Sequence, residues 1–236
     1  MERLDKILSS QNEQSRTESR QLIRSGKVCV NGSVCRDPSY KLSPEQNDIT
    51  INRKPLFYKK NIYIMLNKPA GILCVSRDPK AKTVVDLLPA ELKRKGLFPA
   101  GRLDKDTVGL VIITDDGDFA HRMLSPRKSI FKHYQAIVDG PIDETHKQRF
   151  EEGIVLADDT VCLPAKLNVI HNEENPLVDV EICEGKFHQI KRMFVAVGRK
   201  VLWLKRISIG GLMLDEKLHE GEYRELSESE KTAIFR

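Results

Sequence analysis

One stretch near the middle of the chain constrains the fold more than any other, because it joins a carboxylate to a buried strand. Residues 110–113, Leu-Val-Ile-Ile, form a short apolar run rich in β-branched side chains. Gly109 precedes this run and an Asp-Asp-Gly turn at 115–117 follows it, which is typical of a central strand. Asp104 is therefore predicted to lie at the mouth of the strand, held by the core yet facing a cleft. The alternative is a charged surface turn, since Asp, Gly and Lys are common in loops.

Length and composition limit the class of protein. A chain of 236 residues predicts one or two domains, and we expect a small unit at 1–58, including a basic linker, and a larger one at 59–236. The apolar runs are much shorter than the about 18 residues that a membrane span needs. The charged N-terminus, Met-Glu-Arg-Leu-Asp-Lys, lacks the apolar segment of a secretory signal. These features predict a cytoplasmic protein that does not enter a membrane.

Charge and ligand-forming residues narrow the possible partners. The net charge of +5 favours a polyanionic partner without establishing one. The five cysteines form no Cys-x-x-Cys pair, which indicates reduced structural thiols, and the six histidines are scattered without metal-ligand spacing. The chain also lacks a Gly-x-Gly-x-x-Gly motif and a phosphate-binding loop. The sequence therefore predicts neither a metal nor a cofactor.

The first part of the chain is predicted to hold two helices and a hairpin. Apolar residues at helical spacing indicate a short helix at 4–8, and a capping box predicts a second helix at 15–26. An Asn-Gly turn at 31–32 between two short apolar runs indicates a β-hairpin. A further strand is expected at 49–51, and the basic, proline-containing segment at 52–60 is the expected linker.

The second helix carries basic residues that we expect on one face. They are spaced four, four and three residues apart: Arg16, Arg20, Arg24 and Lys27. Such a face is usually just solvated, and nucleic-acid binding is the alternative.

The larger unit alternates short strands with a few helices, which predicts an α+β domain on a mixed, largely antiparallel sheet. The expected strands include 62–66, 110–113, 132–138 and 177–183, and the expected helices are 83–88, 117–125, 143–153 and 187–198. Pro126 is expected to end the second of these helices. The last helix is predicted to bury a stripe of four residues: Phe187, Ile190, Phe194 and Val197.

Several segments of the larger unit resemble the pseudouridine synthase family, and most closely its ribosomal small-subunit (RsuA-type) group. The matching residues are Gly101-Arg102-Leu103-Asp104, Thr107, Gly109-Leu110, Thr114-Asp115-Asp116-Gly117, Asn67-Lys68-Pro69-Ala70-Gly71, Lys132-His133-Tyr134, Gly185-Lys186-Phe187-His188-Gln189-Ile190-Lys191-Arg192-Met193 and Leu202 to Gly210. The resemblance extends over nearly the whole chain and implies a central catalytic cleft.

The resemblance implies roles for six residues. The catalytic residues are expected to be Asp104, Tyr134 and Lys191, with the basic side chain facing the carboxylate. The substrate-binding residues are expected to be Arg102, filling the space of a displaced base, Leu204, lining a uracil pocket, and Arg206, supporting RNA. From the pattern alone, the tyrosine could equally be a core residue and the lysine solvent-facing. Three neighbouring carboxylates are alternatives for the catalytic one: Asp106, Asp115 and Asp116.

The N-terminal part resembles a small α/β RNA-binding module named after ribosomal protein S-four, over about residues 1–52. The matching pieces are Arg3-Leu4-Asp5-Lys6, Ser15-Arg16, Leu22-Ile23 with Gly26, and Val30-Asn31-Gly32. This resemblance implies that six basic residues contact RNA: Arg3, Lys6, Arg16, Arg20, Arg24 and Lys27. Contacts of this kind are made mainly to phosphates and to the shape of folded RNA.

The implied reaction breaks the carbon–nitrogen glycosidic bond of a uridine, rotates the base and rejoins it through carbon 5, without transfer of electrons. It needs one ionised carboxylate, as nucleophile or proton acceptor, in a pocket that retains the uracil. A nearby cation such as Lys191 should keep the Asp104 carboxylate ionised. Tyr134 is expected to stack on the base and to relay the proton lost from carbon 5. The target base must first leave its stack, at a cost of roughly a few kcal/mol.

We therefore expect a monomeric isomerase that modifies one uridine of 16S ribosomal RNA, presented in a small-subunit assembly intermediate. One alternative is a large-subunit ribosomal RNA pseudouridine synthase of the same family. Others are a non-catalytic RNA-binding ribosome-assembly factor and a uridine hydrolase that cleaves without rejoining.

Overall fold

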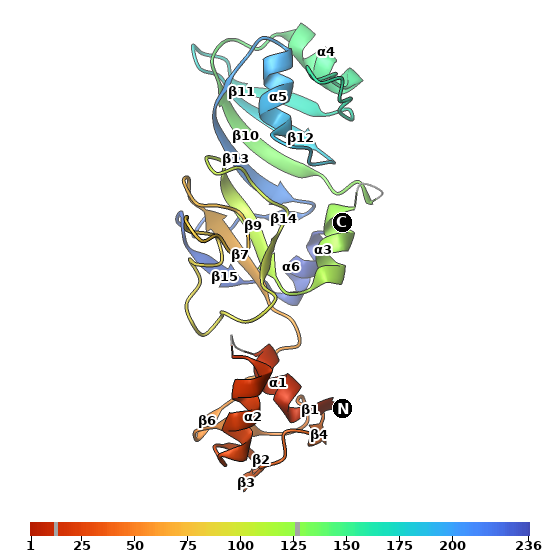
Figure 1. Ribbon diagram of the computed structural model, residues 1–236. Helices are drawn as coiled ribbons and strands as arrows, with labels where there is room; N and C mark the ends of the chain where they lie inside the picture. The colour runs from red at the N-terminus through yellow and green to blue at the C-terminus, as the bar shows by residue number, and fades with distance from the viewer. Residues whose placement is uncertain (12–13, 126–127) are drawn as a thin grey trace. The chain divides into compact units, whose positions relative to one another are not determined.

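The chain divides into two compact units in the computed structural model, which describes residues 1–11, 14–125 and 128–236 (Figure 1). The first unit comprises Met1–Ile62 together with Leu88–Leu97, and the second comprises Tyr63–Leu87 and Phe98–Arg236. Among the described residues, the helices are too short or too polar to cross a membrane.

The first unit packs two helices against a small sheet. Helix α1 spans Leu4–Ser10 and α2 spans Arg16–Arg24. The predicted capping box is confirmed, because the Glu18 amide donates to Ser15 Oγ at 3.1 Å and the Ser15 amide donates to Glu18 Oε2 at 2.5 Å. The four-stranded sheet has the order β3-β2-β5-β6, formed by Ser33–Val34, Val28–Val30, Ile49–Ile51 and Lys54–Pro55. A pair of short strands, β1 (Glu2–Arg3) and β4 (Lys41–Leu42), lies beside it.

Two expectations for this unit are corrected. Helix α2 ends at Arg24 and Gly26 follows with a φ of 75°, so Lys27 is exposed but does not belong to the helical face. The expected linker at 52–60 is structured at its start, because β6 pairs with β5 and Leu56 packs against the hydrophobic core. Pro55 is tolerated there because β6 is an edge strand.

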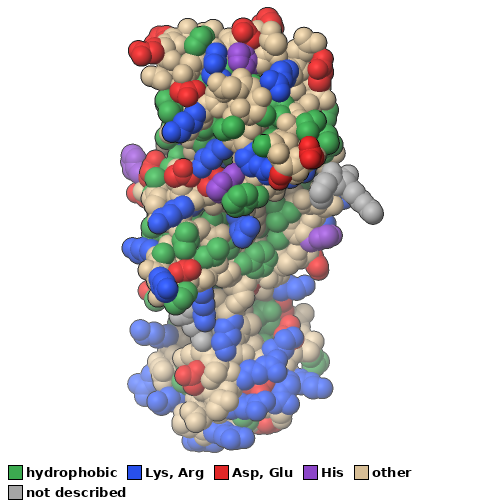
Figure 2. Space-filling model, turned by 45° about the horizontal axis from the view of Figure 1, so that its top comes forward, with side chains coloured by type: hydrophobic (Ala, Val, Ile, Leu, Met, Phe, Trp, Pro, Cys, Tyr) green, Lys and Arg blue, Asp and Glu red, His purple; other side chains and the backbone are tan. Residues whose placement is uncertain are grey.

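Basic side chains are concentrated on the first unit. Its first 62 residues contain 12 Lys and Arg against 7 Asp and Glu, an excess of five that equals the net charge of the whole chain. Figure 2 shows these side chains crowding the surface of the unit in the lower part of the view. The net positive charge of the protein therefore lies on the unit that resembles an RNA-binding module.

The second unit is built on a nine-stranded sheet, which confirms the predicted mixed and largely antiparallel arrangement. The strand order is β11-β12-β10-β13-β9-β7-β15, with β14 paired to β13 and β8 paired to β9. Among the strands named here for the described residues, β9 and β13 form the one parallel pair. The bounds are β7 Tyr63–Lys68, β8 Phe98–Ala100, β9 Val108–Thr114, β10 Lys132–Val138, β11 Lys166–His171, β12 Leu177–Ile182, β13 Val201–Ile209, β14 Leu212–Met213 and β15 Tyr223–Glu225.

Four helices cover this sheet: α3 Gly117–Leu124, α4 Glu144–Glu152, α5 Gln189–Ala196 and α6 Glu228–Ala233. In Figure 1, α4 and α5 lie near the end that carries β11 and β12, and α3 and α6 lie near β9 and β14. Strand β9 is buried at every position, as its apolar run predicts. It therefore lies inside the sheet, between β13 and β7, with the loop before it fixed by the core.

One predicted helix is wrong. Residues 83–88 form turns, in which the Asp86 carboxylate accepts hydrogen bonds from the Thr83 amide at 2.8 Å and from its hydroxyl at 2.9 Å. The proline at 89 also disfavours helical backbone at the residue before it. Helix α3 ends at Leu124 as expected, whereas Pro126 lies outside the described residues.

Candidate active site

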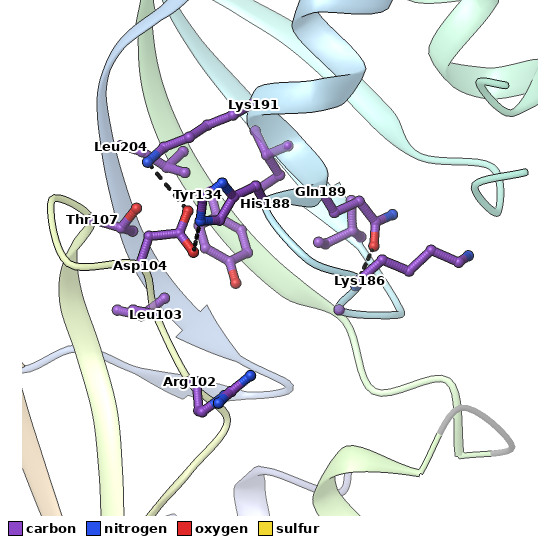
Figure 3. A pocket seen from close by; sticks show the side chains of 13 residues that line it. Arg102, Leu103, Asp104, Thr107, Tyr134, Lys186, His188, Gln189, Lys191 and Leu204 are labelled. Carbon is purple, nitrogen blue, oxygen red and sulfur yellow. Dashed lines mark hydrogen bonds and ion pairs between the residues drawn. The ribbon is translucent and has the colours of Figure 1, made fainter. Parts of the chain in front are cut away.

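The loop between β8 and β9 places Asp104 at the edge of a pocket (Figure 3). Two glycines flank this loop, Gly101 with a φ of 82° and Gly109 with a φ of 99°, and both conformations are unfavourable for other residues. The Asp104 side chain is 25% exposed, so it is held by its surroundings and still reaches solvent. This is the position predicted from the sequence.

Gly109 allows the loop to pack directly on the backbone of β13. In the parallel pair, Gly109 lies opposite Arg206. A Cβ atom on Gly109 would lie 2.3 Å from the Arg206 carbonyl oxygen and 2.9 Å from its nitrogen. The close approach of two strands thus connects the Asp104 loop to a segment far along the chain.

The Arg206 side chain stabilises this contact between the Asp104 loop and β13 from within the core. It is buried, and Nε donates to the Leu110 carbonyl at 2.8 Å while Nη2 donates to the Gly101 carbonyl at 2.7 Å. Nη1 lies 3.4 Å from the Tyr134 hydroxyl oxygen, to which it donates. The expectation that Arg206 supports RNA directly is therefore corrected, because a side chain that is 2% exposed and bonded to carbonyls presents no surface to a phosphate.

Lys68 holds the other side of the loop. The residue is fully buried, and its Nζ donates to the carbonyls of Pro69, Lys105 and Thr107 at 3.1, 3.0 and 2.9 Å. Burial lowers the pKa of Lys68 from its usual 10.5. The Asn-Lys-Pro segment thus has a structural role, because its lysine ties the end of β7 to the residues on either side of Asp106.

Replacing Lys68 by methionine is expected to reduce stability by about 2–4 kcal/mol, because three buried carbonyls lose their donor. It should also reduce the rate at saturating substrate about tenfold, since the loop that carries Asp104 is loosened. Urea denaturation and single-turnover assays below the unfolding transition would separate these effects. Lys132→Met is the matched control, because this lysine is also buried but donates to the carbonyl of Ile130 instead. Equal rate losses in both variants would contradict a positioning role for Lys68.

Lys191 connects α5 to the Asp104 loop. Its Nζ lies 3.2 Å from Asp104 Oδ2 and 2.5 Å from Asp106 Oδ1. Burial lowers the pKa of Lys191, but hydrogen bonds with Asp106 and Asp104 outweigh it, so the pKa is raised above 10.5. The same contact with Lys191 holds the pKa of Asp106 below its usual range. The ammonium group is therefore charged at neutral pH and faces the Asp104 carboxylate, as the resemblance implied.

Tyr134 and Leu204 form the apolar wall of the pocket. They lie on neighbouring strands, since Tyr134 on β10 pairs with Arg206 of β13 and Leu204 pairs with Ala136. Both side chains are buried and line the pocket together with Asp104 and Lys191. Figure 3 shows the aromatic ring beside the carboxylate.

The pocket also contains residues to which sequence reasoning gave no role. His188 Nε2 lies 3.4 Å from Asp104 Oδ1, and its backbone is in the left-handed region with a φ of 48°. The sequence did contain a signal for this residue, because His188 belongs to the segment before α5 that matches the family.

The predicted residue Arg102 is exposed at the pocket and lies apart from the Asp104–Lys191 pair in Figure 3. Seven further residues line the pocket: Leu103, Thr107, Ile182, Gly185, Lys186, Gln189 and Ile190.

The alternative carboxylates have other environments. Asp116 caps α3 by accepting from the Phe119 amide at 2.9 Å, and it accepts from the Tyr63 hydroxyl at 2.6 Å. Asp106 is largely exposed and contacts Lys191 from outside the pocket lining. Asp104 is thus the carboxylate that combines a cation, an aromatic ring and an apolar wall. Such a site can hold a flat, uncharged ring against a reactive carboxylate.

The predicted RNA-binding residues of the first unit are exposed, and a buried carboxylate organises two of them. Arg3 donates to Asp5 through Nε and Nη2, both at 3.0 Å, and Arg20 Nε donates to Asp5 Oδ2 at 2.8 Å. The hydrogen bond from Arg3, opposed by burial and aided by Arg20, lowers the pKa of Asp5 to about 2. This network links the segment before α1 to the basic face of α2.

The Asp5→Asn variant is expected to lose about 2 kcal/mol of stability at pH 7. Because the folded pKa is depressed, the stabilisation by Asp5 is complete above about pH 4 and is lost as the pH falls through about 2. The difference between the variant and the wild type in urea denaturation should therefore shrink across this window. Glu2→Gln is the control, since Glu2 forms an exposed ion pair with Lys6. A constant difference down to pH 2 would contradict this account.

Comparison with known proteins agrees with these features. The pattern of the RNA pseudouridylate synthase family matches residues 62–196, and that of the S4 domain matches residues 2–48. The chain is 40% identical to an uncharacterized RNA pseudouridine synthase of Bacillus subtilis (strain 168), YtzG, covering 97% of this chain and 96% of the relative. It is 40% identical to ribosomal small subunit pseudouridine synthase A of Escherichia coli (strain K12), covering 98% and 99%. A solved structure described as a pseudouridylate synthase matches with a TM-score of 0.69 at 36% identity, covering 99% of this chain and 100% of the other.

Both family resemblances predicted from the sequence are thereby confirmed. The chain belongs to the RNA pseudouridylate synthase family and carries an N-terminal S4 domain.

Proposed function

We propose that this protein converts one uridine of small-subunit ribosomal RNA to pseudouridine, acting in the cytoplasm as a monomer on a partly assembled subunit. The observation that carries the proposed chemistry is the Asp104 carboxylate, 3.2 Å from Lys191 Nζ in a pocket walled by Tyr134 and Leu204. The choice of RNA is supported by the relatives from Escherichia coli and Yersinia pestis, both called ribosomal small subunit pseudouridine synthase A and both 40% identical over nearly the whole chain.

The reaction uses side chains of the pocket alone. Asp104 acts as the nucleophile or proton acceptor that breaks the glycosidic bond, and Lys191 holds its carboxylate through their ion pair. Tyr134 stacks on the detached uracil and passes on the proton lost from carbon 5, while Leu204 closes the other wall. Arg102, which is exposed beside the pocket, occupies the space that the displaced base leaves in the RNA.

The first unit provides affinity for the folded RNA. The exposed basic residues near α1 and on α2 bind phosphates: Arg3, Lys6, Arg16, Arg20 and Arg24, with Lys27 just beyond the helix. Binding of this kind depends on salt and on RNA shape rather than on base sequence. It is suited to a substrate in which ribosomal proteins already hold the RNA in its fold.

The test is to incubate the purified protein with 16S RNA that carries tritium at carbon 5 of uracil, both naked and in partly assembled subunits. Large-subunit RNA is assayed in parallel, and the products are identified as nucleosides. Tritium release with pseudouridine from small-subunit RNA is the expected result, and its size in the two forms identifies the substrate. Pseudouridine from large-subunit RNA alone would overturn the assignment of the RNA. Free uracil would indicate a hydrolase, and binding without change a non-catalytic assembly factor.

A further inference from the structure

A pair of stacked rings precedes α5 beside the catalytic pocket. The ring centroids of Phe187 and His188 are 3.8 Å apart with an angle of 17° between the planes. Phe187 is 73% exposed, so it does not belong to the buried stripe predicted for this helix, which Ile190, Phe194 and Val197 do form. An exposed phenylalanine held flat against a second ring has one covered face and one face open to solvent.

The backbone keeps the pair in this position. His188 precedes the first residue of α5 with a φ of 48°, a conformation that non-glycine residues seldom adopt and that is often found at functional sites. Arg192, one turn into the helix, donates to the Phe187 carbonyl at 3.4 Å. The left-handed residue therefore turns the phenylalanine outward instead of letting it join the core.

The rings also lie close to the reacting groups. His188 Nε2 is 3.4 Å from Asp104 Oδ1, so a single ring separates Phe187 from the catalytic carboxylate. His188 lines both the catalytic pocket and a neighbouring groove, whose apolar walls come from residues 155–157 of the loop after α4 and from Val195 and Ala196 of α5. Phe187 lies between two lining residues of the pocket, Lys186 and His188, and stacks on the second, so a polynucleotide strand that leaves the pocket over His188 passes its exposed ring.

We propose that Phe187 is a stacking platform for the nucleobase next to the target uridine in the RNA. The inference rests on the proposed function and adds a substrate contact outside the uracil pocket. Bases stack on exposed aromatic rings irrespective of their identity, and each such contact is worth about 1–3 kcal/mol. Two basic residues are near Phe187: Lys186 precedes it in the chain, and Arg192 donates to its carbonyl. Both suit the adjoining phosphates, although each also contacts an acidic residue, Glu184 or Asp158. Stacking would hold the flanking nucleotide in place while the target base is displaced.

The test combines variants of Phe187 with RNA that lacks one base. After the modified uridine is mapped, small-subunit RNA is prepared with an abasic nucleotide on one or the other side of it. Single-turnover rates at subsaturating enzyme are compared for the wild type and for Phe187→Ala, Phe187→Leu and Phe187→Trp. Phe131→Ala is the control, because Phe131 is an exposed phenylalanine of the same unit that does not line the pocket.

On intact RNA, the alanine and leucine variants are expected to be about tenfold slower, the tryptophan variant close to the wild type, and the control unchanged. One of the two abasic RNAs should slow the wild type by a similar factor and should not slow Phe187→Ala further. Wild-type rates in Phe187→Ala, or full losses from both abasic positions in that variant, would overturn the platform while leaving the proposed function intact. No pseudouridine from the wild type on any RNA would instead overturn the proposed function, and the platform with it.

Discussion

Replacing Asp104 by asparagine is expected to reduce pseudouridine formation by a factor of at least about 10⁴, the scale of loss seen when a nucleophile is removed. The amide has the shape of the carboxylate but can neither attack as an anion nor accept a proton. The side chain is 25% exposed, so the substitution should leave the fold intact. The variant should therefore bind RNA with unchanged affinity, and single-turnover assays with a parallel filter-binding measurement check both statements.

Asp106→Asn is the matched control for this prediction. Asp106 contacts the same lysine at 2.5 Å but lies on the exposed side of the loop. Its loss leaves the ion pair between Lys191 and Asp104, and the rate should fall by less than about tenfold. An inactive Asp106→Asn with an active Asp104→Asn would move the catalytic role to the neighbouring carboxylate.

Replacing Lys191 by methionine is expected to have the second-largest effect, a loss of about 10²–10³ in the rate of the chemical step. Methionine keeps most of the length and removes the charge, so Asp104 and Asp106 both lose the ammonium group that contacts them. Single-turnover rates of the variant and the wild type measure this loss.

The alkaline side of the pH–rate profile provides a further check on Lys191. Its folded pKa is raised, so its charge and the stability it contributes are complete below 10.5 and are lost only as the pH rises through the higher folded value. The wild-type rate should thus show no loss from Lys191 between about pH 7 and 10. Lys186→Met is the control, because Lys186 lines the same pocket but pairs with Glu184. Equal losses in both lysine variants would indicate a general effect of charge on RNA binding.

The parts of the site that follow from local sequence were predictable. The carboxylate before β9 and the capped helix α2 each depend on neighbours within a few residues, and both lie where the sequence places them. It was also predictable that Lys191 lies outside the stripe of buried residues on α5. Its contact with Asp104 was not, because helix periodicity does not say which loop a helix will meet. The family resemblance supplied that information.

The errors have two physical causes, which are contacts with distant segments and local backbone geometry that side-chain periodicity does not reveal. A basic residue in an alternating strand is normally expected to be solvated, but carbonyls of Leu110 and Gly101 satisfy Arg206 inside the core. Phe187 fits the periodicity of a buried stripe, and the left-handed backbone at His188 removes it. The segment at 83–88 looks helical, but the Asp86 carboxylate accepts hydrogen bonds from the amide and the hydroxyl of Thr83 and so offers the backbone an alternative.

The parallel pairing of β9 with β13 has a consequence for the order in which this protein matures. The loop of Asp104 is locked only when Gly109 meets Arg206, a contact between segments separated by most of the second unit. Contacts of such long range form late, whereas the first unit consists mainly of short-range pairings. A chain emerging from the ribosome can therefore complete most of its basic N-terminal unit before its active site exists. Catalysis therefore begins only after the ribosome has synthesised the last quarter of the chain, which contains Arg206.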